Sequence, residues 1–209
     1  YGTDPTLQDS NENGTIDGDE DSDSDGLSDA DEINIHKTNP KVKDTDEDGL
    51  SDGEEVSLTT NPSVADTDND LISDGIEVKI LNSNPLKIDS DGDGTNDGNE
   101  DSDSDGLSDG EEVNIHDTDP NMPDTDGDGL RDGVEVNVLE TNPLNEDSDN
   151  NSIKDGDEDS DSDGLINSDE LKRFGTSPVM KDTDNDGSSD GDEINKYKTD
   201  PSTSDSDLD

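Results

Sequence analysis

One spacing constrains this chain more than any other feature: oxygen-bearing acids recur at positions 1, 3, 5, 9 and 12 of a twelve-residue segment. Residues 124–135, DTDGDGLRDGVE, carry the pattern in full, with Gly129 at position 6 and Leu130 at position 7. Acids placed so close together can turn their oxygens toward one point only if the backbone folds sharply between them, and glycine permits such a turn. The segment therefore predicts a compact loop that holds a cation.

The segment occurs ten times at regular intervals. These loops begin at Asp9, Asp21, Asp44, Asp66, Asp89, Asp101, Asp124, Asp147, Asp159 and Asp182, and an eleventh, at Asp205, is cut off after five residues. The intervals are 12, 23, 22, 23, 12, 23, 23, 12, 23 and 23 residues. We call the 12-residue intervals short units and the others long units. A fixed period of this kind indicates a repeat array.

A higher period groups the units into blocks. The distances from Asp89 to Asp147 and from Asp147 to Asp205 are both 58 residues. The predicted organisation is the end of a preceding repeat at 1–8, block 1 at 9–88 (loops at 9, 21, 44 and 66), block 2 at 89–146 (loops at 89, 101 and 124), block 3 at 147–204 (loops at 147, 159 and 182), and a truncated loop at 205–209. Because both ends fall inside a repeat, we expect adjoining repeats of a longer chain.

The pattern predicts calcium. Ten loops give 50 places at positions 1, 3, 5, 9 and 12, and all are Asp or Glu except Asn11, Asn13, Asn151 and Asn167, so 46 of the 64 acids lie there. Asparagine still offers an oxygen, so we expect lower charge without a lost ligand. An EF-hand-type loop uses the side chains at 1, 3 and 5, the carbonyl at 7 and a bidentate Glu at 12, with position 9 often acting through water. That many oxygens suit Ca²⁺ rather than six-coordinate Mg²⁺.

The predicted metal ligands, loop by loop, are Asp9, Asn11, Asn13, Thr15 and Glu20; Asp21, Asp23, Asp25, Leu27 and Glu32; Asp44, Asp46, Asp48, Leu50 and Glu55; Asp66, Asp68, Asp70, Ile72 and Glu77; Asp89, Asp91, Asp93, Thr95 and Glu100; Asp101, Asp103, Asp105, Leu107 and Glu112; Asp124, Asp126, Asp128, Leu130 and Glu135; Asp147, Asp149, Asn151, Ile153 and Glu158; Asp159, Asp161, Asp163, Leu165 and Glu170; Asp182, Asp184, Asp186, Ser188 and Glu193. The position-9 residues, predicted to bind through water or to stand behind the direct ligands, are Asp17, Asp29, Asp52, Asp74, Asp97, Asp109, Asp132, Asp155, Asn167 and Asp190.

Composition makes the ion a structural component. Only 20% of the residues are hydrophobic, 1% are aromatic, and the net charge is −52. So little apolar surface does not offset a chain entropy of about 1–2 kcal/mol per residue. The absence of cysteine excludes disulfides and thiolate metal sites. No apolar segment is long enough for a membrane span, and the acidity excludes nucleic acid as a partner. The sequence starts without Met or an apolar stretch, so we expect any export signal to lie outside it.

The predicted fold is an elongated array of EF-hand-like loops with little regular secondary structure and short single-turn helices. In the long units an apolar residue follows each loop at position 13, and more follow at 15 or 16, which suits one or two helical turns. The Asp at position 9 is placed to cap this helix. Eight of nine prolines stand four residues before a loop, where they end any helix. Three or four apolar side chains per unit pad a joint but form no globular core.

The residues resemble thrombospondin type 3 repeats from Asp9 to Asp209. The likeness rests on DSDSDGLSDGEE (101–112), DTDGDGLRDGVE (124–135) and the alternation of short and long units. Without linker cysteines, the chain is similar to the bacterial or archaeal form. The resemblance implies calcium-dependent folding, an extracellular or cell-surface setting and a structural role as a stalk. Leu71 and Ser152 depart from it, because they replace the glycine at position 6, and we expect strained or weaker loops there.

The sequence thus predicts a calcium-binding extracellular repeat protein that folds around about ten Ca²⁺ ions and acts as a rigid stalk, spacer or filament segment. Self-association into filaments is open. No paired carboxylates have the apolar pocket needed for acid–base catalysis, so we expect no enzyme. The alternatives are a calcium store or mineral-nucleating acidic protein, and a dockerin-like recognition module. A zinc site at His36 or His116 is the less favoured reading of those residues. The short units, which have no linker, are predicted to form the tightest packed pairs with the loops that follow.

Overall fold

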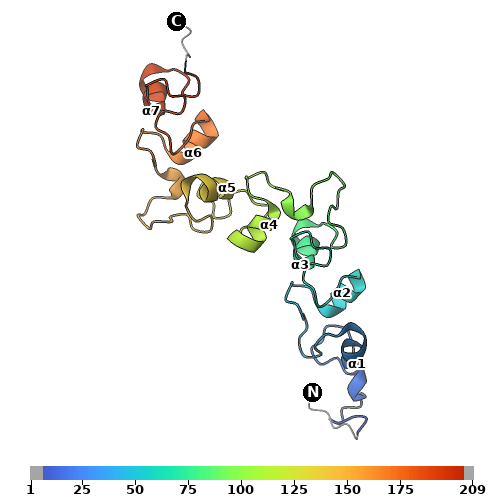
Figure 1. The fold of residues 1–209 in the computed structure, drawn as a ribbon. Coiled ribbons are helices and arrows are strands. Elements are labelled where there is room, and N and C mark those ends of the chain that lie inside the picture. The colour runs from blue at the N-terminus through green and yellow to red at the C-terminus, as the bar shows by residue number, and fades with distance from the viewer. Residues whose placement is uncertain (1–6, 205–209) are drawn as a thin grey trace. The chain divides into compact units, whose positions relative to one another are not determined.

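A computed structural model describes residues 7–204 of the chain, and the truncated loop at Asp205 and the first six residues lie outside this range. The chain divides into two compact parts, residues 1–100 and 101–209, which we call the first and second halves and describe separately. Within the described range, each half consists of long loops joined by short helices, and no strand is present (Figure 1). The predicted array of loops with little regular secondary structure is therefore confirmed.

Each long unit contributes one short helix, of about two turns, that begins at position 9 of the loop. In most long units an α-helical turn continues directly into a π-helical turn, so that the two segments form one eight-residue helix. The pairs are α1 (Asp29–Asp31) with η2 (Glu32–His36), α3 (Asp74–Ile76) with η3 (Glu77–Leu81), α4 (Asp109–Glu111) with η5 (Glu112–His116), α5 (Asp132–Val134) with η6 (Glu135–Leu139), α6 (Asn167–Asp169) with η8 (Glu170–Phe174), and α7 (Asp190–Asp192) with η9 (Glu193–Tyr197).

The unit at 44–65 differs because it is one residue shorter. Its helix α2 (Asp52–Leu58) is a regular α-helix throughout. A π-turn is an α-helix with one residue inserted. The 22-residue and 23-residue units therefore keep the same loop-to-loop connection, and the additional residue is absorbed as a π-turn. In both kinds the helix ends on a left-handed residue whose N–H bonds to the carbonyl of the position-12 glutamate, as Thr59 does to Glu55 and Lys37 to Glu32.

The short units end in single 3-10 turns instead. These are η1 (Asp17–Asp19), η4 (Asp97–Asn99) and η7 (Asp155–Asp157). The turn η1 packs directly on α1, where a side chain built on Gly18 would lie 3.3 Å from the Cβ of Ala30. The turn η7 packs on α6 in the same way, and the Asn167 amide donates to the carbonyl of Asp155 at 2.7 Å. At these two places the short unit and its successor are in direct helix-to-helix contact.

The helix caps correct one prediction. Position 9 is the first helical residue, and the cap is the residue before it, at position 8. Ser51 accepts a hydrogen bond from the N–H of Glu54 while the Glu54 carboxylate accepts from the N–H of Ser51, which is a capping box. Ser28, Ser73, Ser108 and Ser189 cap their helices as well. The Asp at position 9 does not cap, because its carboxylate is engaged elsewhere in the loop.

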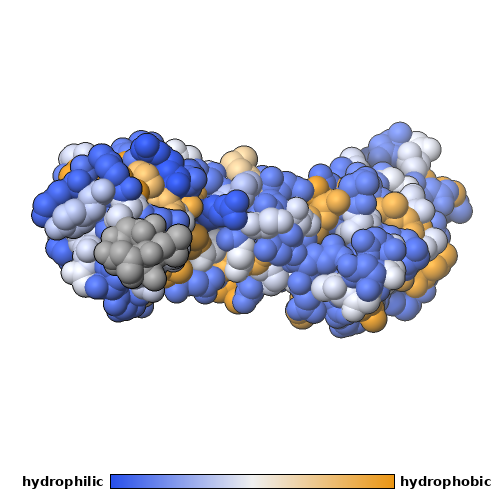
Figure 2. All heavy atoms as spheres, turned by 90° about the horizontal axis from the view of Figure 1, so that it is seen from above, coloured by the Kyte–Doolittle hydropathy of each residue, from blue (hydrophilic) through white to orange (hydrophobic). Residues whose placement is uncertain are grey.

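The interior of the described range contains few apolar side chains and many carboxylates. The five buried large apolar residues all stand at loop position 7; they are Leu50, Ile72, Leu107, Leu130 and Leu165. Glutamates at position 12 of the long units are at most 1% exposed, which is as buried as these leucines. Blue, hydrophilic atoms accordingly dominate the visible surface, with scattered orange patches (Figure 2). None of the described helices has the length and apolar character that a membrane crossing requires.

Candidate metal centres

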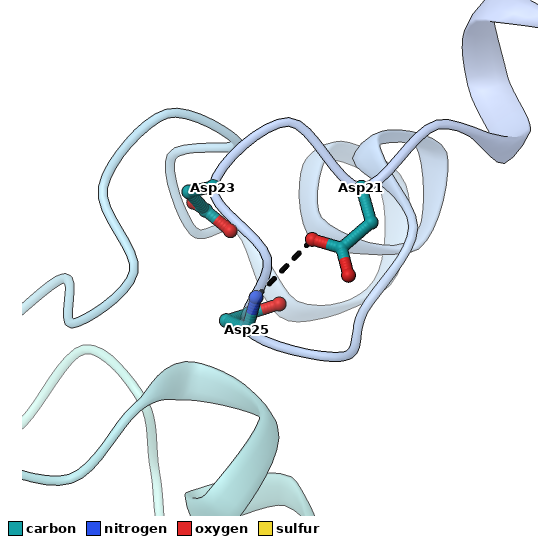
Figure 3. A group of neighbouring side chains, drawn as sticks. All are labelled: Asp21, Asp23 and Asp25. Carbon is teal, nitrogen blue, oxygen red and sulfur yellow. Dashed lines mark hydrogen bonds between the residues drawn. The ribbon is translucent and has the colours of Figure 1, made fainter.

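Each loop is wound by hydrogen bonds that turn its acidic side chains inward. In the loop at Asp21, the N–H of Asp25 donates to Oδ1 of Asp21 at 3.2 Å. The N–H of Leu27 donates to Oδ1 of Asp25 at 2.7 Å. The carboxylates of Asp21, Asp23 and Asp25 then lie around one turn of backbone, with oxygens within 4.8 Å of one another (Figure 3). The same arrangement of positions 1, 3 and 5 recurs at Asp44, Asp46 and Asp48, and at Asp66, Asp68 and Asp70.

The turn at position 6 requires a left-handed backbone. Gly26 has φ +103° and Gly106 has φ +105°. The predicted exceptions adopt the same geometry with a side chain, since Leu71 has φ +90° and Ser152 has φ +75°. A left-handed conformation is unfavourable for any residue with a Cβ. The two position-6 residues that depart from glycine in the sequence therefore place a Cβ in the left-handed region.

Position 9 closes the loop rather than only facing the ion. In the loop at Asp44, the N–H and hydroxyl of Thr45 donate to the two carboxylate oxygens of Asp52, at 2.8 and 2.7 Å. The N–H of Asp52 itself donates to the carbonyl of Lys43, one residue before the loop. The partner residue at position 2 is Ser or Thr in all ten loops. The sequence analysis missed this role, although the uniform position 2 was a visible signal.

In each 23-residue unit the position-12 glutamate accepts a hydrogen bond at one oxygen and has no partner at the other. In the loop at Asp101, the Thr118 hydroxyl donates to Oε1 of Glu112 at 3.2 Å. Oε2 of Glu112 is buried and has no hydrogen-bond partner. The same pair of contacts occurs at Glu32, Glu77, Glu135, Glu170 and Glu193, whose hydroxyl donors are Thr38, Ser83, Thr141, Thr176 and Thr199. In the shorter unit both oxygens of Glu55 lack a partner.

The electrostatics of these glutamates are unfavourable without a cation. Burial first, and then the charges of Asp103 and Asp105, raise the pKa of Glu112 to about 8. Burial and the neighbouring acids likewise raise the pKa of Glu55 to about 8 and that of Glu32 to about 7. A buried carboxylate with a free oxygen, surrounded by further carboxylates, is the environment that a divalent ion stabilises. Hard oxygen donors of this kind fit calcium.

A second acidic cluster forms where a long unit meets the next unit. Asp25 and Glu32, at positions 5 and 12 of one loop, approach Asp52, at position 9 of the following loop. Asp48, Glu55 and Asp74 repeat the arrangement one unit later. Both Glu32 and Asp52 are fully buried. Joints between long units are thus lined with carboxylates, where an ordinary repeat protein would place leucines.

The same joints depend on a glycine at position 10. The N–H of Gly133 donates to Oδ2 of Asp105 in the preceding unit, at 2.9 Å. A Cβ on Gly133 would lie 2.6 Å from the carbonyl oxygen of Asp105. Gly53, Gly75, Gly156 and Gly191 make the same contact with Asp25, Asp48, Asp128 and Asp163. Where the preceding unit is short, position 10 is Ala30, Gly110 or Ser168, and the sequence analysis missed this rule.

Basic side chains complete the joints. Lys43 and Lys181, each just before a loop, donate to the carbonyls of Ser24 and Ser162 at position 4 of the preceding loop, at 3.3 and 2.9 Å. Arg131 donates to the carbonyl of Ser104 at 2.9 Å. None of the twelve bases lies within positions 1–7 of a loop. Their exclusion from the loops is thus matched by contacts that join one unit to another.

A twelve-residue loop of converging acids, a buried glutamate at its last position and a fixed joint to the next loop define a class of protein: a repeat array built on oxygen-ligand metal sites. A comparison with models of known families shows which family of this class the chain belongs to. The model of the bacterial TSP3 repeat matches residues 21–43, 44–65, 66–88, 101–123, 124–146 and 182–203. These segments are more than half of the chain, and the chain belongs to this family of calcium-binding repeats.

Two solved structures share part of the sequence. A "Biofilm associated protein - B domain" is 41% identical over 22% of this chain and 11% of its own, with a TM-score of 0.22. A "Biofilm associated protein - BSP domain" is 43% identical over 21% of this chain and 8% of its own, with a TM-score of 0.21. The chain therefore spans about a tenth of the length of the structures that it matches. No curated protein matches it.

Proposed function

We propose that this chain is a calcium-binding, extracellular or cell-surface structural protein, which acts as a rigid stalk, spacer or filament segment and not as an enzyme. The ions take the place of an apolar core. The observation that supports this proposal most strongly is the buried, unpartnered Oε2 of the position-12 glutamates of the long units, because a charged carboxylate in that place is unfavourable without a cation.

The ligands of each ion are the predicted ones: the side chains at positions 1, 3, 5 and 12 and the carbonyl at position 7. The acids listed above for each loop fill these roles, and the ten loops correspond to about ten ions. The position-9 aspartate and its Ser or Thr partner keep the loop closed. The acidic joint clusters, such as Asp25, Glu32 and Asp52, offer further calcium-binding capacity between units.

The structural role follows from what calcium does to the joints. With the ions bound, position 5 of one unit is held by its own loop while it contacts the glycine of the next, so each unit fixes its neighbour. Repeat proteins of this kind gain stability from each unit and each interface. A succession of such joints keeps attached parts apart, and its side-by-side assembly into filaments is the further possibility that the same proposal contains.

The test is chelation of the full chain. Circular dichroism and small-angle X-ray scattering are measured in millimolar calcium and again after excess EGTA. We expect an ordered, stiff particle with calcium that loses helix and becomes a flexible coil without it, because binding and folding are one linked equilibrium. A chain that is equally flexible in both states would overturn the stalk and support a calcium store or mineral-nucleating protein.

A dockerin-like recognition module makes a different prediction. Such a module would bind a partner protein through long helices after two loops, whereas the described helices here contain no more than eight residues and follow seven loops. Native mass spectrometry of the calcium-loaded chain reports the number of bound ions and any self-association in one measurement. A particle with only two bound ions would contradict the array of occupied loops.

A further inference from the structure

Two of the ten loops, at residues 9–20 and 147–158, differ from the others in what occupies the middle of the loop. Both belong to short units, and both carry Asn at position 5, as Asn13 and Asn151; the first also has Asn11 at position 3. The third short unit, 89–100, has Asp91 and Asp93 at these positions and serves as an internal comparison.

The winding of the loop engages the one oxygen of the Asn at position 5. Oδ1 of Asn13 accepts from the N–H of Thr15 at 2.7 Å, and Oδ1 of Asn151 accepts from the N–H of Ile153 at 2.8 Å. Oδ1 of Asp93 accepts the equivalent bond from Thr95 at 2.8 Å. An aspartate keeps a second oxygen for an ion after making this bond. An asparagine can offer only the remaining lone pair of the same oxygen, because its other group, the NH₂, is a donor and cannot ligate a cation.

The NH₂ groups donate to the remaining carboxylates of these loops. Nδ2 of Asn13 and Nδ2 of Asn11 donate to Oε1 of Glu20, at 2.8 and 2.7 Å. Nδ2 of Asn151 donates to Oε1 of Glu158 at 2.6 Å and to Oδ2 of Asp149 at 3.2 Å. In the second loop a single amide thus bridges positions 3 and 12, two of the groups that a calcium ion would bridge.

The position-12 glutamates of these loops also lack the fully buried, unpartnered oxygen that favours a cation in the long units. Glu20 and Glu158 are half-buried and extended, and their carboxylates have hydrogen-bond donors. In the long units the equivalent glutamates are fully buried with a free oxygen. At positions 1, 3, 5 and 12, whose side chains are the direct ligands, the loop at Asp9 has two acids and the loop at Asp147 has three, where each of the other loops has four. Calcium affinity of such loops falls with the number of charged ligands.

We propose that the loops at 9–20 and 147–158 are closed by an amide latch in place of an ion, and that they load calcium only at concentrations above those that fill the carboxylate loops. To admit an ion, the NH₂ groups must release the position-12 glutamate, which they hold by the hydrogen bonds to Glu20 and Glu158. The array then has two classes of site, of which the low-affinity class lies in short units. This inference rests on the proposed calcium binding.

The test follows individual loops by NMR in the full chain. The amide of the position-6 residue reports on its own loop, so the resonances of Gly14, Gly94 and Ser152 are followed as calcium is added to the ion-free protein. We expect Gly94 to shift at low calcium and Gly14 and Ser152 only at higher concentrations. A shared midpoint for all three amides would overturn the latch while leaving calcium binding intact. If no position-6 amide responds to calcium, the proposed function fails instead.

Two exchanges at the same loop position complete the test. Asn151→Asp removes the latch, and we expect the Ser152 midpoint to move to that of Gly94 and the tightly bound class to gain one ion by native mass spectrometry. Asp93→Asn installs a latch in the comparison loop, and the Gly94 midpoint then moves to higher calcium. An unchanged Ser152 midpoint in Asn151→Asp contradicts the inference. This variant adds a ligand rather than removing one, so the conclusion does not depend on whether Asp93→Asn folds.

Discussion

A buried glutamate with only one hydrogen-bonded oxygen is the most demanding residue of each 23-residue unit. Its hydroxyl partner, Thr118 in the case of Glu112, donates to one oxygen, and the other oxygen is buried without a partner. A threonine holds the carboxylate in place without neutralising it, so the free oxygen remains available to an ion. The charge that makes the ion-free protein costly is therefore the same charge that makes calcium binding favourable.

The raised pKa values of these glutamates determine how the stability of the ion-free chain changes with pH. The pKa of Glu77 and of Glu135 is raised to about 8 in the fold, against about 4.3 in an unfolded chain. Between these values the folded chain binds more protons than the unfolded chain, so the free energy of unfolding decreases as the pH rises. We expect metal-stripped protein to have more helix by circular dichroism at pH 5 than at pH 8.

Calcium reverses the direction of this pH dependence. The ion binds the deprotonated carboxylates, so in millimolar calcium the melting temperature is expected to increase from pH 5 to pH 8. The pH series without calcium and the pH series with calcium control for each other, because they use the same chain and the same buffers. An ion-free chain whose helix content increases toward pH 8 would contradict the burial of charged glutamates.

Leu71 supplies a prediction about backbone strain. It holds the left-handed position that glycine fills in most loops, with φ +90°. Replacing it by glycine removes a steric cost of about 1–2 kcal/mol, partly offset by the greater freedom of glycine in the unfolded chain. We expect Leu71→Gly to raise the free energy of unfolding by about 1 kcal/mol in calcium, measured by urea denaturation.

The reverse exchange provides the matched control. Gly106 has φ +105° and open space around its would-be Cβ, so Gly106→Leu changes the backbone preference without a packing clash. This variant is expected to lower stability by a similar amount. Equal stability of Leu71→Gly and the parent chain would show that the leucine recovers its strain through contacts of its own.

At the scale of elements, the joint between units is a contact between a helix and a loop. Where the preceding unit is long, the first helical turn of the next unit lies against the middle of the preceding loop, and glycine at position 10 lets the two backbones approach. The contact joins two functions in one residue: Asp105 lines its own loop and accepts the N–H of Gly133 from the next unit. Loading a loop therefore also stiffens the joint beside it.

Gly133→Ala tests this joint, because the helix alone and the close approach at the joint predict changes in stability of opposite sign. In a free helix alanine is more favourable than glycine by about 1 kcal/mol. Here the added methyl would lie 2.6 Å from the carbonyl of Asp105, and overpacking of this kind typically costs about 1–3 kcal/mol. We expect a net loss of stability in calcium-dependent urea unfolding. A stabilised variant would show that the close approach is absent.

The control is a substitution to alanine at the same loop position, in a unit that follows a short unit. Ser168 stands at position 10 of its loop and follows the short unit 147–158. Ser168→Ala keeps the Cβ and removes only the hydroxyl, so it adds no atom against an earlier loop, and it raises helix propensity by a few tenths of a kcal/mol. It should therefore leave stability unchanged or slightly increased, so that the two alanine variants separate the joint from the helix.

The sequence predicted the loops and their acids but not the side chains that hold them. The position of Glu112 follows from spacing to Asp101 alone, because the metal pattern is local. The role of Thr118 does not, because it depends on a helix that returns the chain to its own loop. The π-turns were equally hidden: a unit of 23 rather than 22 residues signals an insertion, but only the path of η2 shows that the insertion lies within the helix.

Position 10 shows a different limit of the sequence. Glycine there weakens an isolated helix, and the composition of one unit gives no other reason for it. The reason lies in the preceding unit, and it becomes visible only when Ala30 and Ser168 are compared with Gly133 according to the length of the unit before them. Local rules therefore predict the sites, while the joints require the three-dimensional relation of two units.

At the scale of the whole molecule, charge determines which ions stabilise the chain. Sixty-four acids against twelve bases leave a net charge of −52, and monovalent salt screens this repulsion without filling a loop. The stability of the loaded chain is the sum of units and joints, each linked to ion binding. The dependence on calcium is therefore expected to extend along the chain rather than to reside in one site.

Magnesium distinguishes filled loops from screened charge. Each carboxylate loop offers a bidentate Glu and several further oxygens, which suit the larger ion, whereas Mg²⁺ prefers six ligands and keeps its waters. We expect millimolar calcium to restore the helix signal and the melting transition of stripped protein, and equal magnesium to restore much less. Sodium chloride at matched ionic strength is the control. Equal recovery in all three salts would mean that screening alone folds the chain.

The glycine-to-aspartate joint has a consequence for how such a chain changes in length. Any long unit offers the same carbonyl, and any unit that follows it brings the same glycine, so the interface does not identify particular neighbours. A 58-residue block could be duplicated or lost by unequal crossing-over in the gene, and both new boundaries would still match without a compensating substitution. The length of such an array can therefore change by whole blocks without further substitutions.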